Sequence, residues 1–330
     1  MNIESYYKNK KVLVTGGLGF LGSNLALKLS ALGAKVSLVD CCLPGHGGNP
    51  FNISDIRDGA EWINGDIRDE SLMRNAFKGQ EVVFNIAAQT SHTDSMKNPM
   101  LDADINIKGQ LNLLNAFRET CPGARIVYCS SRAVYGSSDK KTNDENALPN
   151  PLDIYSTHKL AGEFFHKIYG NVFGLNACVL RVANGYGPRA QMKEPSFGIL
   201  NWFMRLALDD REIKIFGDGM QVRDYAYVDD ISGAFLAAGA AQDLKGEILN
   251  VGSGRGVPLI EIVRHIVRIA GKGKIVHVPW PEVNKKIDAG DFIADVDKIK
   301  KRLGWSPQTS LEDGLKITIG YYEKFRSHYW

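Results

Sequence analysis

The first half of the chain alternates short apolar runs, rich in β-branched residues, with longer segments of helical periodicity. Strands are predicted at 11–16, 35–40, 81–88 and 125–131, and helices at 21–33 and 107–120. Residues 12–14 are continuously apolar, which is typical of a strand buried on both faces of a parallel sheet. Leu25, Leu29 and Leu32 keep helical spacing. The alternation predicts an α/β fold with a doubly wound parallel sheet.

The regular alternation ends after about residue 175, where long loop-like segments interrupt it. We therefore expect two lobes, 1–175 and a smaller C-terminal lobe at 176–330. The segment YVDDISGAFLAAGAA predicts a helix at 227–241 that packs back on the sheet. The chain at about 225–250 is thus expected to return to the first lobe.

A glycine-rich turn follows the first predicted strand. Gly16, Gly19 and Gly22 lie three residues apart in TGGLGFLG, between that strand and the helix after it. Such glycines permit a tight turn, close approach of the backbone to a pyrophosphate, and close packing of the helix, whose N-terminus favours phosphate. The motif in this setting predicts a dinucleotide site.

Asp40 ends the next predicted strand, 18 residues after Gly22. Its carboxylate suits the two ribose hydroxyls of NAD and would repel the 2′-phosphate of NADP. Cys41 and Cys42 follow it, so no arginine stands there to neutralise a phosphate. We therefore predict NAD as the cofactor.

Composition narrows the class of protein. The 330 residues are 44% hydrophobic, which is enough for one large core or two fused lobes. The net charge of +3 is small and the basic residues are dispersed, so no nucleic-acid partner is expected. Neither a membrane span nor a signal peptide is visible, which predicts a soluble cytoplasmic protein without a membrane partner. The five cysteines show no metal-ligand spacing, so we expect reduced thiols and no metal site.

Tyr155 and Lys159 begin the amphipathic segment YSTHKLAGEFF and are four residues apart, so both emerge from one helix face. A free phenol titrates near pH ~10, and a neighbouring ammonium stabilises its phenolate. This pairing favours a tyrosine that acts as a base near neutral pH. Ser131 ends the predicted strand RIVYCSS and offers a hydroxyl to the same substrate oxygen.

Together these motifs resemble the extended short-chain dehydrogenase/reductase family, which includes NAD-dependent nucleotide-sugar epimerases and dehydratases. The resemblance covers essentially the whole chain and is carried by TGGLGFLG, Asp40, GDIRD, NIAAQTS, INIKG, SSRAVYG, YSTHK, RVANGYGP, GDGMQVRDYAYVDD and KRLGWSPQTSLEDGL. It implies a Rossmann-type NAD-binding domain at 1–175, a nucleotide-sugar-binding lobe at 176–330, tightly held NAD and often a homodimer.

The resemblance also implies roles for individual residues. The catalytic set is Ser131, Tyr155 and Lys159. The cofactor is expected against Gly16, Gly19, Phe20, Leu21, Gly22, Asp40, Asp66, Ile67, Ala87, Ala88, Gln89, Asn106, Tyr155 and Lys159. The nucleoside-diphosphate sugar is expected against Thr90, Ser91, His92, Asn184 and Arg223.

The two residues after Ser131 bear on the type of reaction. Dehydratases of the family carry Asp and Glu there, decarboxylases a glutamate at the second position, and 3,5-epimerases a cysteine, whereas this chain has Arg132 and Ala133. Alanine cannot transfer a proton. The resemblance therefore implies 4-epimerisation of a UDP-hexose or UDP-uronate through a transient 4-keto intermediate. A nucleotide-sugar 2-epimerase, a UDP-glucuronate decarboxylase and a non-catalytic NAD-binding sensor stay open as alternatives.

Two segments depart from the family pattern. Many 4-epimerases have an arginine just before the Gly-Asp of the C-terminal lobe, where this chain has Asp288 and Ala289. The loop CCLPGHGGNPFNI after Asp40 is also unusual, and the pattern predicts no function for it.

Overall fold

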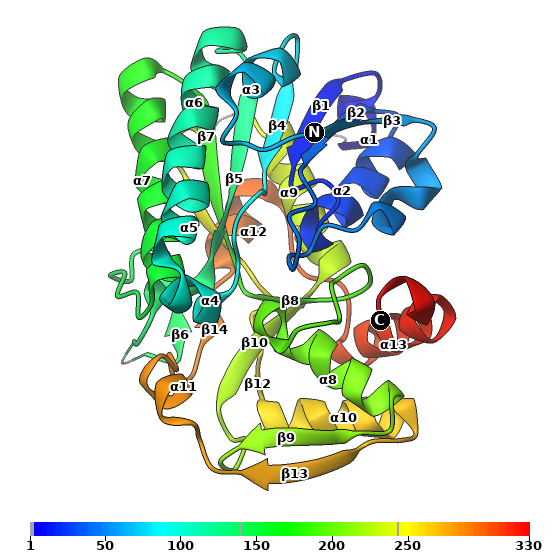
Figure 1. Cartoon of the computed structure of the whole chain (residues 1–330). Coiled ribbons are helices and arrows are strands. Elements are labelled where there is room, and N and C mark those ends of the chain that lie inside the picture. Colours follow the sequence, from blue (N-terminus) through cyan, green and yellow to red (C-terminus); the bar gives the residue numbers. More distant parts are fainter. Residues whose placement is uncertain (1–2, 139, 243) are drawn as a thin grey trace.

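Seven parallel strands form the central sheet of the computed structural model, which describes residues 3–138, 140–242 and 244–330 (Figure 1). The strands are β1 (Lys11–Thr15), β2 (Lys35–Asp40), β3 (Ala60–Asn64), β4 (Val82–Asn85), β5 (Arg125–Ser131), β7 (Asn176–Val182) and β11 (Ile248–Val251). Their order is β11-β7-β5-β4-β1-β2-β3. The chain reverses direction across the sheet between β1 and β4, and ligands of doubly wound sheets bind at such a switch point.

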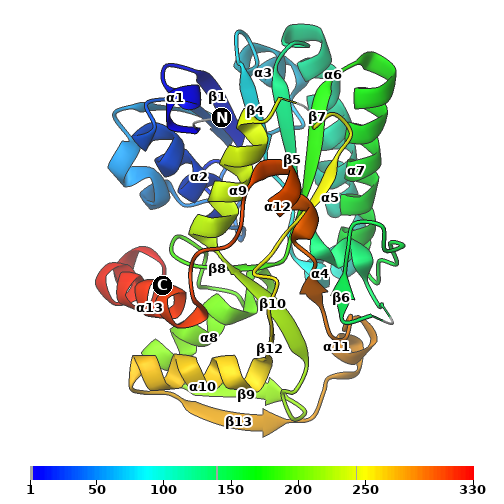
Figure 2. The same cartoon turned by 180° about the vertical axis from the view of Figure 1, so that it is seen from behind.

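Helices cover both faces of this sheet (Figures 1 and 2). One face carries α1 (Ile3–Tyr7), α2 (Phe20–Ala31) and α9 (Val228–Ala240), and the other carries α3 (Glu70–Ala76), α6 (Gly109–Thr120) and α7 (Ile154–Phe173). Val12 and Val14 pack into the first core and Leu13 into the second. The continuous apolar run therefore reflects burial on both faces, which confirms the predicted fold class.

The C-terminal region forms smaller layers below the sheet (Figure 1). Its strands are β8 (Asn184–Tyr186), β9 (Glu212–Phe216), β10 (Val222–Tyr227), β12 (Gly256–Pro258) and β13 (Lys274–Val278), and its helices are α8 (Ile199–Leu208), α10 (Leu259–Ala270), α11 (Glu282–Lys286) and α13 (Leu311–Phe325). Strands β12, β10 and β8 pair in one sheet and β13 and β9 in another. Buried side chains such as Phe203, Ile262 and Ile319 join the three longer helices in one core.

Short elements complete the fold. They are α4 (His92–Lys97), α5 (Pro99–Ala103), α12 (Asp297–Leu303), β6 (Thr142–Asn143), β14 (Ile293–Ala294), a π-helical turn at Asp104–Lys108 and 3-10 turns at Pro50–Ile56, Arg132–Tyr135, Pro195–Phe197 and Arg326–His328. Strand β14 pairs with β6 and so ties the C-terminal chain to the loop after β5. No helix among the described residues is both long and apolar enough to cross a bilayer.

The expected lobe boundary at residue 175 falls directly before β7, which pairs with β5 in the central sheet. Helix α9 and strand β11, within the expected returning segment at about 225–250, also belong to the sheet and its core. We propose a two-lobe organisation in which β7, α9 and β11 are part of the first lobe.

Candidate active site

The glycine turn joins β1 to α2 at the switch point of the sheet. Gly16 has a φ of +69°, which favours glycine, and Gly19 N donates to Gly16 O at 3.1 Å. A Cβ on Gly22 would lie 2.1 Å from Gly16 O, and one on Gly16 would lie 3.0 Å from the backbone of Ala87. Close packing at these two positions therefore excludes any side chain. The turn leaves the N-terminus of α2 facing the cavity, where it favours phosphate.

Asp40 lies at the end of β2 beside this turn. Its Oδ2 accepts from Leu18 N at 3.0 Å and its Oδ1 accepts from Cys42 N at 2.8 Å. Burial raises the pKa of this carboxyl, and the two backbone hydrogen bonds oppose that rise. The carboxylate is thus held in one orientation at the cavity edge, where a ribose hydroxyl can donate to it.

Four further predicted cofactor positions differ in whether they line the cavity. Ala87 and Ala88 line it directly after β4. Gln89 is buried, and its carbonyl accepts from Asn106 Nδ2 at 2.9 Å. Asn106 lies in the π-helical turn and also donates to Asp102 Oδ1 at 3.0 Å. Gln89 and Asn106 therefore do not line the cavity themselves but support the residues that do.

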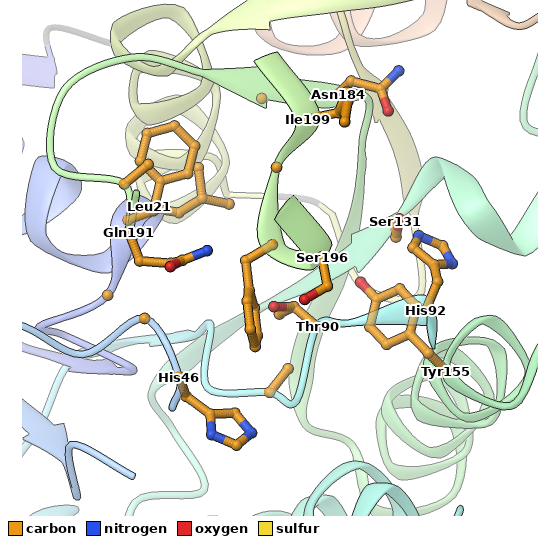
Figure 3. Close-up of a pocket in the computed structure, with 18 of the residues that line it drawn as sticks. Leu21, His46, Thr90, His92, Ser131, Tyr155, Asn184, Gln191, Ser196 and Ile199 are labelled. Carbon is orange, nitrogen blue, oxygen red and sulfur yellow. The ribbon is translucent and has the colours of Figure 1, made fainter. Parts of the chain in front are cut away.

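The catalytic candidates converge from two elements. Asp153 begins α7, because its Oδ1 accepts from Ser156 N at 2.7 Å, and this cap places Tyr155 in the first turn. Tyr155 and Lys159 are 6% and 2% exposed, and both line the cavity with Ser131. The Lys159 ammonium lies 4.4 Å from the centre of the Tyr128 ring. Figure 3 shows Tyr155, Ser131, His92 and Thr90 grouped on one side of the cavity.

The acidity of Tyr155 differs from the prediction. Burial raises the pKa of its phenol, and a hydrogen bond with Ser131 opposes the rise. Burial also lowers the pKa of Lys159, opposed by the charge of Glu163. The direction is therefore opposite to the predicted fall in the phenol pKa, because loss of solvent disfavours the phenolate.

His92 belongs to a pair that the sequence did not predict. Its Nδ1 lies 2.6 Å from Asp153 Oδ2, and its ring meets that of Tyr155 edge-on at 4.9 Å between centres. Thr90 and His92 line the cavity. Ser91 is fully buried instead, and its hydroxyl accepts from Asp94 N as the cap of α4.

Asn184 and Arg223 line the cavity from the C-terminal strands. Asn184 Nδ2 donates to Asp224 O at 3.0 Å. The guanidinium of Arg223 is already engaged, since it donates to Gly290 O and pairs with Asp288 Oδ1. The unusual Asp288 thus neutralises the arginine that the resemblance assigns to phosphate.

These walls enclose one large cavity of about 950 Å³. The remaining predicted cofactor residues that line it are Gly16, Gly19, Phe20, Leu21, Gly22, Asp40, Asp66 and Ile67. Residues without a predicted role also contribute, and they include Leu43, His46, Gly47 and Gly48 of the unassigned loop, Arg132, Phe197, Phe216 and Trp280. In the sequence, only the glycines of this loop indicated that it could approach a ligand closely. No sequence pattern indicated that Phe216 or Trp280 would line the cavity.

A phosphate-binding turn at the switch point and a Tyr–Lys–Ser group in the same cavity are the features of a nicotinamide-dependent enzyme. Comparison with known proteins agrees. The chain belongs to the NAD dependent epimerase/dehydratase family, whose model matches residues 12–252. The family assignment confirms the resemblance, the enzyme class and NAD as the cofactor.

Similar proteins span nearly the whole chain. A putative UDP-glucose 4-epimerase of Methanocaldococcus jannaschii is 34% identical over 94% of this chain and 97% of its own length. The crystal structure of a UDP-glucose 4-epimerase with UDP-glucose from Thermotoga maritima has a TM-score of 0.87 and 34% identity, covering 96% of this chain and 99% of that chain. The structure of the Thermus thermophilus UDP-glucose 4-epimerase complex with NAD has a TM-score of 0.84 and 30% identity. The match covers 95% of this chain and 99% of that chain.

The residues present fit NAD. The side-chain-free turn at Gly16 and Gly22 leaves room for backbone to approach a pyrophosphate, and Asp40 is oriented for ribose. Lys159 and Tyr155 line the same cavity as this turn.

Proposed function

We propose that this enzyme epimerises a nucleoside-diphosphate sugar, a UDP-hexose or UDP-uronate, at C4 through a transient 4-keto intermediate. The observation that carries the proposal is the grouping of Tyr155 and Ser131 on one cavity wall, followed by the buried, chemically inert Ala133. A reaction that needs a second acid or base at the position of Ala133 therefore lacks the group to carry it out.

The side chains have distinct parts in this reaction. Ser131 positions the C4 hydroxyl by hydrogen bonding, and Tyr155 accepts its proton. Bound NAD would supply the hydride acceptor and a positive charge that favours the phenolate of Tyr155. Lys159 adds a second positive charge to the same buried wall. After the keto sugar has rotated in the site, the hydride returns to the opposite face of C4 and Tyr155 returns the proton to the C4 oxygen.

We also propose the contacts of substrate and cofactor. Thr90 and His92 contact the sugar, and Asn184 and Arg223 contact the diphosphate, which competes with Asp288 for Arg223. Ser91 acts through the cap of α4 that positions His92. The cofactor residues are those given by the resemblance, with Gln89 and Asn106 as supports of the wall. Phe216 and Trp280, whose ring centres are 5.5 Å apart, line the cavity in the C-terminal lobe and offer stacking surfaces for the nucleotide base.

We further propose a cytoplasmic homodimer, since NAD and nucleotide sugars are cytoplasmic metabolites. Helix α7 presents Phe164, Ile168 and Val172 on one face, with exposed fractions of 53%, 49% and 68%. Three large apolar side chains one turn apart are suited to burial against a second copy. Sedimentation should give a dimer, and Ile168→Glu should shift it to monomer; a monomeric wild type would contradict the assembly.

The direct test is product analysis. Purified protein is incubated with UDP-glucose, UDP-glucuronate and CDP-linked sugars, and the sugars are released and identified. The proposal expects the C4 epimer. Inversion at C2 would establish a 2-epimerase and release of carbon dioxide a decarboxylase, whereas NAD binding without turnover of any sugar would indicate a sensor. Loss of the product with Tyr155→Phe ties the activity to this site.

A further inference from the structure

Arg132 is a cation of the cavity wall whose side chain has no acidic partner in the described part of the chain. Arg132 directly follows Ser131, begins the 3-10 turn Arg132–Tyr135 and lines the cavity. Across residues 3–138, 140–242 and 244–330 its side chain makes no hydrogen bond or ion pair. Its one close contact is with an aromatic ring, since the guanidinium carbon lies 5.6 Å from the centre of the Phe292 ring.

The carboxylates nearest Arg132 are already engaged. Asp153 accepts from Ser156 with one oxygen and pairs with His92 through the other. Asp288 pairs with Arg223. The electrostatic surroundings of Arg132 consist of these two carboxylates, Arg223 and Tyr225. The wall beside Ser131 therefore carries the positive charge of Arg132 without an acidic partner among the described residues, in addition to the charge of Lys159.

That charge persists at neutral pH. Burial and the repulsion of Arg223 lower the pKa of Arg132 only to about 10. Arg132 is partly buried, so its guanidinium loses part of its hydration with no anion to replace it, and its planar fork matches two carboxylate or phosphate oxygens. The expected occupant of this wall is therefore an anionic group of the ligand.

We propose that Arg132 binds a carboxylate on the sugar ring, so that the substrate is a nucleoside-diphosphate hexuronate. This inference rests on the proposed 4-epimerisation and narrows its substrate. The enzyme then distinguishes a uronate from the corresponding neutral hexose by one charge-assisted, bidentate contact.

The position of Arg132 favours the sugar carboxylate over the diphosphate. Ser131 and Tyr155 hold the oxygen on C4, and Arg132 is joined to Ser131 by a peptide bond. In a pyranose, the carboxylate carbon is attached to C5, the direct neighbour of C4. The diphosphate is attached to C1, at the opposite end of the ring. A side chain next to the C4 contact is therefore within reach of the carboxylate, and the diphosphate, to which the resemblance assigns the nearby Arg223, is the competing ligand that the test separates.

The test compares two substrates that differ only at C6. UDP-glucuronate carries the carboxylate, and UDP-glucose carries an uncharged hydroxymethyl group. Arg132→Met should lower kcat/KM for UDP-glucuronate about 100-fold and change that for UDP-glucose less than about 3-fold. Arg132→Lys keeps the charge and should lower the uronate value only about 10-fold, because lysine loses the fork. Arg264→Met, at an exposed position of α10, removes one positive charge elsewhere and should change neither.

Calorimetric titration with UDP-glucuronate, UDP-glucose and UDP alone separates the outcomes. The inference expects Arg132→Met to weaken UDP-glucuronate selectively. Equal weakening of all three ligands would assign Arg132 to the diphosphate, and no weakening would leave it without a ligand; either result overturns the inference. If the wild type epimerises neither sugar, the proposed function fails, yet the titrations still decide the role of Arg132. Unchanged melting temperatures confirm that the variants fold.

Discussion

The two ends of the cavity are built in different ways. At the cofactor end the ligand faces backbone, because Gly16 and Gly22 leave no space for side chains and the N-terminus of α2 opens toward phosphate. At the sugar end the wall is made of side chains, among them the charged Arg132 without an acidic partner in the described chain and His92 held by Asp153. Backbone geometry serves the cofactor, which is the same for every substrate. Side chains decide which sugar is turned over, so the two ends should respond differently to substitution.

The largest effect is expected at Tyr155. Tyr155→Phe removes the proton acceptor and should lower kcat by about 1,000-fold or more while the Kd for NAD changes less than about 3-fold. Stopped-flow turnover and NAD titration measure the two quantities. Parallel loss of both would show that the tyrosine supports the cofactor end instead.

Glycine substitution tests the close packing at the cofactor end. Gly22→Ala places a Cβ 2.1 Å from Gly16 O and should destabilise the fold by about 3 kcal/mol, seen as a lower denaturation midpoint. Gly320→Ala is the matched control, because nothing lies within 4 Å of the added Cβ in α13 and alanine should stabilise that helix by about 0.5–1 kcal/mol. Equal stability of the two variants would refute the close packing of the turn.

Asp40 tests cofactor choice at the same end. Asp40→Ala removes the acceptor for the ribose hydroxyls and the charge that repels a 2′-phosphate, so the preference for NAD over NADP should fall about 10-fold. Fluorescence titration with both dinucleotides gives the ratio. A ratio equal to that of the wild type would exclude this carboxylate from cofactor discrimination.

The smallest effect is expected at His92. His92→Ala leaves Asp153 Oδ2 without its partner and should lower kcat/KM about 5-fold. His92→Asn supplies a donor near the Nδ1 position and should recover most of the loss. If Asn is no better than Ala, His92 acts through its other nitrogen rather than by orienting Asp153.

The sequence predicted the residues of the cofactor end well, but it predicted the contacts at the sugar end only in outline. Strand periodicity and three glycines locate the turn, because both signals lie within one short segment. The pairs His92–Asp153 and Arg223–Asp288 join residues 61 and 65 positions apart, so only the folded chain brings them together. The sequence showed Arg132 only as a position at which dehydratases of the family carry an acid, and it predicted no role for the arginine itself. The pKa of Tyr155 depends on burial, which spacing along a helix does not reveal.

The central claim is that Tyr155 removes a proton from the C4 hydroxyl while the C4 hydrogen leaves as hydride and returns to the same carbon. UDP-glucuronate deuterated at C4 tests it most directly, followed by mass and NMR analysis of the epimerised product. The account predicts a slower turnover than with the unlabelled sugar, and a product that keeps the deuterium at C4. Loss of the label to solvent, or a rate unaffected by it, would contradict the claim.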